Sequence, residues 1–199
     1  MRMVGGLLFV CHANLCRSPM AEYIARAMLT DMAPAADAPV AVSSAGTHAV
    51  PGQPMHPHAA AVAAQWSGES HTFRSRPVTA AALARAGVVL TATREQRGAC
   101  VALAPGAIRR TFTLRQFSRL VTAATERGWP TAEIDAAPAE RLAALVSTAG
   151  RARALVQPAR AGEDDLADPL GQPLGQFRRC AGEIERALRP VVDVIAKPC

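Results

Sequence analysis

Short, strongly apolar segments recur along this chain of 199 residues, and longer segments with helical spacing separate them. Apolar runs of roughly four to eight residues are typical of strands buried on both faces of a sheet. Because parallel neighbours need a crossover connection, strands that alternate with helices predict an α/β sandwich around a parallel sheet. The expected strands are residues 4–10, a second strand within 39–50 that runs into a glycine turn, 87–92 and, as an edge strand, 108–113.

Ser, Thr and Pro residues mark where the intervening helices should begin. Ser18 suits an N-cap and Pro19 the first helical position, while Thr93 and Gln96 form a capping-box pattern. Pro190 should kink or end the last helix, which is clearly amphipathic. The expected helices follow Ser18 and Thr93 and cover residues 57–66, 80–85, 114–127, 138–153 and 174–195.

Composition limits the class of protein. With 50% hydrophobic residues the chain can build one core, so a single domain over residues 1–199 is expected. The net charge is +6 and the pI about 9.7, with the basic residues scattered, which predicts a bias toward anionic substrates and not nucleic acid. One Tyr, two Trp and five Phe also leave little surface for base stacking.

The N-terminus and the cysteines bear on the compartment. No signal peptide is visible, and the apolar run at 7–10 is too short to cross a membrane, so we expect a cytoplasmic protein without membrane contact. Five cysteines at irregular spacing do not make a disulfide framework, and no pair of CxxC motifs is present. We therefore expect no metal site and no cofactor.

The stretch FVCHANLCRSPMAE, residues 9–22, joins the first strand to the first helix. A loop at such a junction aims backbone N–H groups inward and makes an anion nest. This setting favours a thiolate at Cys11, the planar guanidinium of Arg17 suits two phosphate oxygens, and Ser18 can donate to the sulfur. These parts fit nucleophilic attack on phosphorus through a cysteinyl-phosphate.

A bare Cys with Arg-Ser six residues later is a weak signal by itself. The same residues fit a buried structural Cys11 beside a chance Arg17-Ser18 pair, and the local pattern leaves both interpretations open. The end of the first strand is, however, where open α/β sheets place their ligand sites.

Several segments resemble the low-molecular-weight protein tyrosine phosphatases, in that family's order. VCHANLCRSP at 10–19 resembles the family's loop, which commonly reads V-C-x-G-N-I-C-R-S-P. SSAGT at 43–47 and GVVLTA at 87–92 resemble its second- and third-strand motifs. HTFRSRP at 71–77 resembles its His-x-x-Arg stretch, and DDLADPLG at 164–171 resembles its late Asp-Pro loop. The chain is identified as a member of this family.

The resemblance implies a three-layer α/β sandwich with a four-stranded parallel sheet of order 2-1-3-4 and helices on both faces. It implies a protein-tyrosine phosphatase in which Cys11 is the nucleophile and Arg17 clamps the transition state. Asp168 would protonate the leaving oxygen and later activate water. The residues expected to surround the phosphate are His12, Ala13, Asn14, Leu15, Cys16 and Ser18.

The resemblance also implies supporting residues and partners. Asn14 would shape the loop through hydrogen bonds with Ser44 and His71, and Leu170 would face the loop from beside Asp168. The expected substrate is a phosphotyrosine-containing protein, such as a bacterial tyrosine kinase, with inorganic phosphate as product and inhibitor. A monomer or weak dimer is expected.

The chain departs from the family's pattern within the site. Ala13 stands where Gly is common, which leaves the loop less φ freedom. Leu170 replaces the Tyr that usually follows Asp-Pro, and Val50 lies where many members carry another aromatic residue, so stacking on phosphotyrosine should contribute less. The family's acidic residue after the third strand is absent at 91–93. The chain is also long, and we place a helical insertion at about 119–163.

Cys16 resembles the second loop cysteine of members in which a disulfide reversibly traps the nucleophile, so a Cys11–Cys16 redox latch is one interpretation and simple packing of Cys16 the other. Cys100, Cys180 and Cys199 have no partner at helpful spacing.

Three other functions remain as alternatives. A thiol-linked arsenate reductase needs further cysteines on a mobile segment, where only Cys100 lies in the right region. A protein arginine phosphatase carries Thr where this chain has Leu15, and the bulkier Leu15 favours a phenyl ester. A pseudo-phosphatase would bind phosphate or phosphoproteins without turnover, but the joint presence of Cys11, Arg17, Ser18 and Asp168 argues against it.

Overall fold

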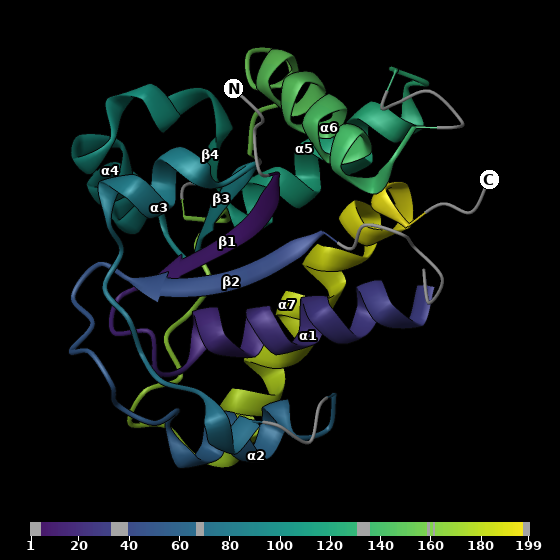
Figure 1. The fold of residues 1–199 in the computed structure, drawn as a ribbon. Helices are drawn as coiled ribbons and strands as arrows, with labels where there is room; N and C mark the ends of the chain where they lie inside the picture. Colours follow the sequence, from purple (N-terminus) through teal and green to yellow (C-terminus); the bar gives the residue numbers. More distant parts are fainter. Residues whose placement is uncertain are drawn as a thin grey trace.

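A parallel sheet of four strands lies at the centre of the computed structural model (Figure 1). The structure describes residues 5–32, 40–66, 70–130, 136–158, 160 and 162–196. The strands run in the order β2-β1-β3-β4, and every pairing is parallel, so the predicted sheet and strand order are confirmed. Their bounds are Gly6–Cys11 for β1, Ala41–Gly46 for β2, Val88–Thr91 for β3 and Thr111–Thr113 for β4.

Helices connect the strands and follow the last of them. They are α1 (Arg17–Met32), α2 (Pro57–Ala63), α3 (Ala80–Arg85), α4 (Arg94–Leu103), α5 (Leu114–Glu126), α6 (Pro138–Ala152) and α7 (Leu174–Ile195), with the short 3-10 helices η1 (Ser70–Thr72) and η2 (Pro105–Arg110). None of the helices in the described ranges is both long enough and apolar enough to cross a membrane.

Each face of the sheet carries its own hydrophobic core, which gives the fold its three layers. Along β1, Leu7 and Phe9 join the core that contains the buried faces of α1, α5, α6 and α7. Leu8 and Val10 point the other way and join the core formed with α3, α4 and η2. Figure 1 shows α1 and α7 on one side of the sheet and α3 and α4 on the other, so the predicted helices on both faces are confirmed.

The parallel register aligns the C-terminal ends of the strands at one edge. Cys11 pairs with Gly46, and Val10 pairs with Thr91. Gly46 permits a close approach there, because a Cβ at this position would lie 2.5 Å from the carbonyl oxygen of His12. The loop that follows β1 therefore passes directly over the end of β2.

Some predicted boundaries differ from the structure. The second strand ends at Gly46, in the predicted glycine turn, whereas the second helix ends at Ala63 instead of Trp66. The fourth strand begins at Thr111, because η2 occupies the residues before it. Ile108, whose apolar side chain suggested an earlier start, is 47% exposed and contributes little to either core.

Two predicted helix N-caps do not form as predicted. The hydroxyl of Thr93 does accept from the backbone N–H of Gln96, but Oε1 of Gln96 has no partner in the described structure, so only half of the capping box forms. Helix α1 begins at Arg17, and Ser18 is inside the helix and not its N-cap. The hydroxyl of Ser18 instead donates to the carbonyl of Ala45, 3.1 Å away.

Pro190 does not end the last helix, which continues to Ile195. A proline inside a helix removes one backbone hydrogen bond and costs about 3 kcal/mol. Leu188, Val191 and Val192 around it are completely buried. Tertiary packing of this apolar face against α1 and α5 offsets the local cost.

Truncating the buried face of α7 should destabilise the whole domain. We expect Leu188→Ala to lower the free energy of unfolding by about 2–5 kcal/mol, because it removes a fully buried side chain and leaves a cavity. Arg189→Ala, on the exposed face, breaks an ion pair with Glu185 and should change it by about 0–1 kcal/mol. Urea unfolding of both variants measures the difference; equal losses would contradict the packing role.

Candidate active site

The loop between β1 and α1 brings Cys11 and Ser18 together. Cys11 is the last residue of β1 and is 97% buried, and its Sγ lies 3.0 Å from Oγ of Ser18. Cys16 closes the loop, since its carbonyl accepts from the N–H of Met20. The structure thus brings the sulfur to the start of a helix, where backbone N–H groups have no intrahelical partners.

Asn14 sets the shape of the loop. Its φ is +56°, and it is the one residue other than glycine with positive φ in the described ranges. Asparagine tolerates this left-handed conformation better than most residues. The strain expected at Ala13 does not arise, because the left-handed position falls on Asn14 instead.

The completely buried side chain of Asn14 ties the loop to two other segments. Its Nδ2 donates to Oγ of Ser18 and of Ser44, each at 2.9 Å. Its Oδ1 accepts from the backbone N–H of Arg76 at 2.9 Å. The predicted contact with Ser44 is present, but the predicted contact with His71 is wrong, because His71 is exposed on η1. The bridge between Gly46 and Pro77 explains the replacement, since it holds the residue before the proline beside the loop.

A buried carboxylate supports this network and was missed by the sequence analysis. Glu22 is 99% buried on α1, accepts from Oγ of Ser44 at 2.5 Å, and forms ion pairs with Arg26 at 2.5 Å and Arg76 at 3.2 Å. Two guanidinium groups compensate the charge of this carboxylate. Its sequence signal was the spacing of Ser18, Glu22 and Arg26, which places three polar residues on one helical stripe.

Arg17 and Asp168, 151 residues apart in sequence, meet over the loop. Nη2 of Arg17 forms an ion pair with Oδ2 of Asp168, and Nη1 donates to the carbonyl of Leu166 at 3.1 Å. Oδ1 of Asp168 accepts from the backbone N–H of Leu170 at 3.2 Å. The side chain of Arg17 is 6% exposed and that of Asp168 is 44% exposed, so the carboxylate stands at the mouth of the site.

Neighbouring aspartates hold the segment that carries Asp168. Asp164 forms a buried ion pair with Arg119 of α5 at 2.9 Å. Asp165 accepts from the backbone N–H of Arg94 at 2.8 Å and pairs with its guanidinium. These contacts give the three aspartates different positions: Asp164 and Asp165 anchor the loop, and Asp168, the aspartate that the resemblance singled out, faces the Cys11 loop.

Within the described residues, one donor of the Arg17 guanidinium is unpaired. Nε of Arg17 is buried and has no hydrogen-bond partner in the described structure. Ala92 and Leu166 line a void of about 10 Å³ beside Arg17, and the N–H of Leu166 donates to the carbonyl of Ala92. A substrate oxygen or a water molecule can supply the acceptor that the protein lacks.

Histidine and aliphatic residues stand at the positions where the sequence comparison expected an aromatic slot. The rings of His12 and His48 stack with centroids 4.4 Å apart, and the N–H of His48 donates to the carbonyl of His12. Val50 is 58% exposed and Leu170 is 51% exposed. Leu15 is partly buried against the core, and its carbonyl accepts from the N–H of His56.

The other described cysteines lie in settings that favour the neutral thiol. Burial, with smaller contributions from Asp168 and Cys11, raises the pKa of Cys16 to about 12. Burial likewise raises the pKa of Cys180 to about 12 and that of Cys100 to about 11. Cys11 and Cys16 are both free thiols, and their disulfide stays a prediction. Cys199 lies outside the described residues.

In the described ranges, no group of three or more His, Cys, Asp or Glu side chains is arranged so that it could hold a metal ion.

Comparison with known proteins assigns the family. The profile described as "Low molecular weight phosphotyrosine protein phosphatase" matches residues 6–127. The chain belongs to this family. Cys11 at the start of the loop fits the cysteine-dependent mechanism of these phosphatases. The matched residues include the Cys11 loop, Ser44 and Arg76 but not Asp168, and whether 119–163 is an insertion stays a prediction.

Individual proteins similar to this chain are also named as phosphatases. A protein of Ralstonia solanacearum named "Probable low molecular weight protein-tyrosine-phosphatase EpsP" is 32% identical over 118 residues, which is 58% of this chain and 76% of the relative. The YwlE arginine phosphatase from Geobacillus stearothermophilus has a similar structure, with a TM-score of 0.64, 25% identity, and coverage of 94% and 90%. Wzb of Vibrio vulnificus, solved with benzylphosphonate, has a TM-score of 0.65, 19% identity, and coverage of 96% and 98%, which shows a common fold.

Asn14 offers a direct test of the loop. Asn14→Ala removes three buried hydrogen bonds and puts at positive φ a residue that tolerates this conformation less well than asparagine, so we expect a loss of about 2–4 kcal/mol in unfolding free energy and reduced kcat/KM for an aryl phosphate. Asn14→Gly removes the same bonds without the backbone strain and should be about 1 kcal/mol more stable than Asn14→Ala. Wild-type activity in both variants would refute a positioning role.

Thiol alkylation tests the cysteine assignments. Cys16, Cys100 and Cys180 have pKa values raised to about 11 or 12, so each remains protonated near pH 7.5 and should react slowly with iodoacetamide. We expect Cys11 to be modified first and to be protected by inorganic phosphate. Peptide mass spectrometry over a time course measures each rate, and labelling of Cys16 as fast as Cys11 would contradict the assignment.

Proposed function

We propose that this phosphatase hydrolyses phosphate monoesters of phenols, with protein phosphotyrosine as the principal substrate. The observation that carries the proposal is the convergence of the Cys11 sulfur, the Ser18 hydroxyl and the Arg17–Asp168 pair on one short loop. Nucleophile, thiolate partner, cationic clamp and carboxyl group are then all within one site.

Substrate binding exchanges the partners of Arg17. A phosphate dianion entering the nest competes with Asp168 for the guanidinium, whose planar fork suits two oxygens. The unpaired Nε of Arg17 supplies one donor without loss of an existing bond. The exchange frees the carboxyl of Asp168 at the mouth of the site, on the side where the leaving oxygen would stand.

Two displacements at phosphorus complete the reaction. First, the thiolate of Cys11 attacks phosphorus, the bond to the phenolic oxygen breaks, and protonated Asp168 gives that oxygen its proton. Then water attacks the cysteinyl-phosphate, Asp168 takes the water's proton, and the sulfur leaves as a thiolate. The hydroxyl of Ser18, 3.0 Å away, turns from the carbonyl of Ala45 and donates to this thiolate. Inorganic phosphate is released and can rebind as an inhibitor.

The entrance favours a phenyl ester without strong aromatic stacking. His12 and His48 form one flat surface, while Leu170 and Val50 offer exposed aliphatic contacts. A phosphotyrosine ring can pack against these groups, with less stacking than Tyr or Trp walls would give. A phosphorylated cytoplasmic protein, such as a bacterial tyrosine kinase, is the partner we propose, with the enzyme acting as a monomer or weak dimer.

Phosphoarginine is the second candidate substrate, because an arginine phosphatase is among the similar structures at 25% identity. Leu15 at the loop favours the aryl ester, and a phosphotyrosine peptide should exceed the matched phosphoarginine peptide in kcat/KM. The arsenate-reductase alternative is weaker, because Cys100 is completely buried in the core on the opposite face of the sheet.

The leaving group distinguishes a general acid from a structural aspartate. We expect Asp168→Asn to lower kcat/KM for phenyl phosphate by about 10²- to 10³-fold, because its poor leaving group needs a proton. The loss should be much smaller with p-nitrophenyl phosphate, whose leaving group departs without one. Asp165→Asn, in the same loop, is the matched control and should affect both substrates equally.

Cys11→Ser tests the nucleophile. It should abolish turnover of both aryl phosphates and the burst that a cysteinyl-phosphate produces. Full activity in Cys11→Ser would refute the mechanism. Folded, reduced wild type that binds phosphate but turns over no ester would establish the binding module instead.

A further inference from the structure

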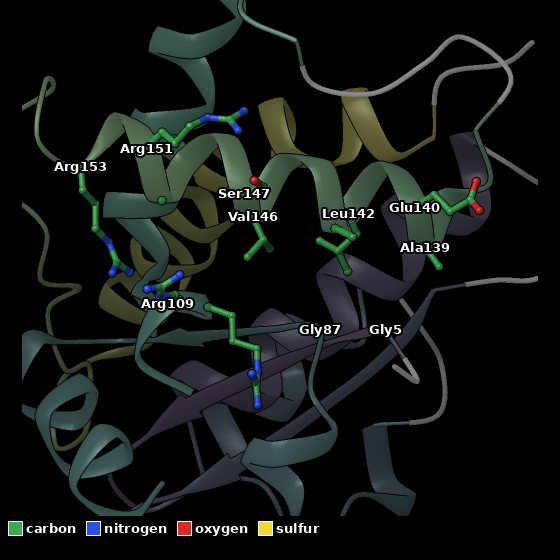
Figure 2. Close-up of a pocket in the computed structure, with 13 residues that line it drawn as sticks. Gly5, Gly87, Arg109, Ala139, Glu140, Leu142, Val146, Ser147, Arg151 and Arg153 are labelled. Carbon is green, nitrogen blue, oxygen red and sulfur yellow. The ribbon is translucent and has the colours of Figure 1, made fainter. Parts of the chain in front are cut away.

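A cavity lies away from the Cys11 loop, at the opposite edge of the sheet. It has a volume of about 690 Å³, which is within the range of sites for small organic ligands. Gly5 and Gly87, which precede β1 and β3, form its floor, and α6 covers it (Figure 2). Because β1 has six residues at about 3.3 Å each, roughly 17 Å separates the two ends of the strand.

One wall of this cavity is apolar. Leu142 and Val146 point from α6 toward the sheet, as Figure 2 shows. The floor carries no side chains, and Gly150 on the same helix leaves further space open. A Cβ at Gly150 would have only the carbonyl oxygen of Arg109 near it, at 3.9 Å. The space stays open because the three glycines that line it, Gly5, Gly87 and Gly150, have no side chains.

The remaining wall is strongly basic. Arg109, Arg110, Arg151 and Arg153 all line the cavity, and none forms an ion pair within the described ranges. In the described structure, Arg110, Arg151 and Arg153 donate to backbone carbonyls and one hydroxyl. Glu140 is the one acidic residue of the lining, and it accepts from the backbone N–H of Ala137.

Two of these guanidinium groups have unused donors. Nε of Arg110 and Nε of Arg153 are buried without a hydrogen-bond partner in the described structure. Arg153 also packs on the ring of Phe112, with its guanidinium carbon 3.8 Å from the centroid. Burial, with a contribution from Arg97, lowers the pKa of Arg153 to about 10, as expected where cations gather without an anion.

We propose that this cavity binds a small organic anion, whose apolar or aromatic body lies on Leu142 and Val146 and whose anionic group contacts Arg109 and Arg153. A phosphate, sulfonate or carboxylate would supply the charge and the acceptors that the arginines lack. The site goes beyond the proposed phosphatase reaction and does not depend on it. It uses α6, which lies outside the residues matched by the family profile.

Fluorescence titration with anilinonaphthalene sulfonate, a bicyclic apolar sulfonate, tests the proposal on the full chain. We expect saturable binding to wild type, and weaker binding of the uncharged parent N-phenyl-1-naphthylamine. Gly150→Leu should fill the cavity and abolish binding, while α6 keeps or gains stability because leucine is the better helix former. Gly98→Leu is the matched control on α4, where a Cβ meets nothing within 4 Å.

A second pair of variants tests the charge. Arg109→Glu should weaken sulfonate binding about tenfold or more, because it replaces a charge-assisted contact with repulsion. Arg85→Glu makes the same charge change at an exposed position of α3, outside the cavity, and should weaken binding far less. Far-UV circular dichroism and hydrolysis of p-nitrophenyl phosphate should be unchanged in both.

Three results would overturn the proposal. They are no saturable binding to wild type, equal binding by Gly150→Leu and Gly98→Leu, and equal weakening by Arg109→Glu and Arg85→Glu. The phosphatase experiments use Cys11 and Asp168, so failure of one proposal leaves the other standing.

Discussion

The hydrogen bonds of one buried amide hold the candidate site together. Asn14 occupies the left-handed conformation that turns the chain from β1 into α1, and its side chain contacts Ser18, Ser44 and Arg76. An unmade bond in such a buried position costs about 1–3 kcal/mol, so the three contacts act as a unit. Without them, the sulfur of Cys11 would have no fixed relation to the donors around it.

Ion pairs between segments far apart in the chain hold the rest of the candidate site in place. Glu22 is buried against Arg76, and Arg17 is buried against Asp168, so each pair joins a residue at the start of α1 to a later loop. A buried charge is tolerated when an opposite charge and hydrogen bonds accompany it. In the Arg17–Asp168 pair the carboxylate is the exposed partner, whereas in the Glu22–Arg76 pair it is the guanidinium, so a phosphate can replace the carboxylate of Asp168.

Much of the fold could be predicted because it depends on local patterns. Apolar runs and cap residues predicted the strands and most of the helices. Pro190 does not end α7, which was one of the two outcomes predicted for it, because packing of the helix outweighs a local preference. The exposed Ile108 misled because a single apolar residue carries no periodicity. The replacement of His71 by the backbone of Arg76 depends on pairing between Gly46 and Pro77, which no local pattern reports.

The sequence by itself determined the fold class, the place of the Cys11 loop between strand and helix, and the resemblance to one phosphatase family, because each lies within a short continuous stretch. Only the tertiary structure decided that Asp168 pairs with Arg17 while Asp164 and Asp165 anchor the loop, and which residues complete the shell of Asn14. It alone revealed the basic cavity under α6. Those features join segments far apart in the chain, and their geometry follows from how the helices pack on the sheet.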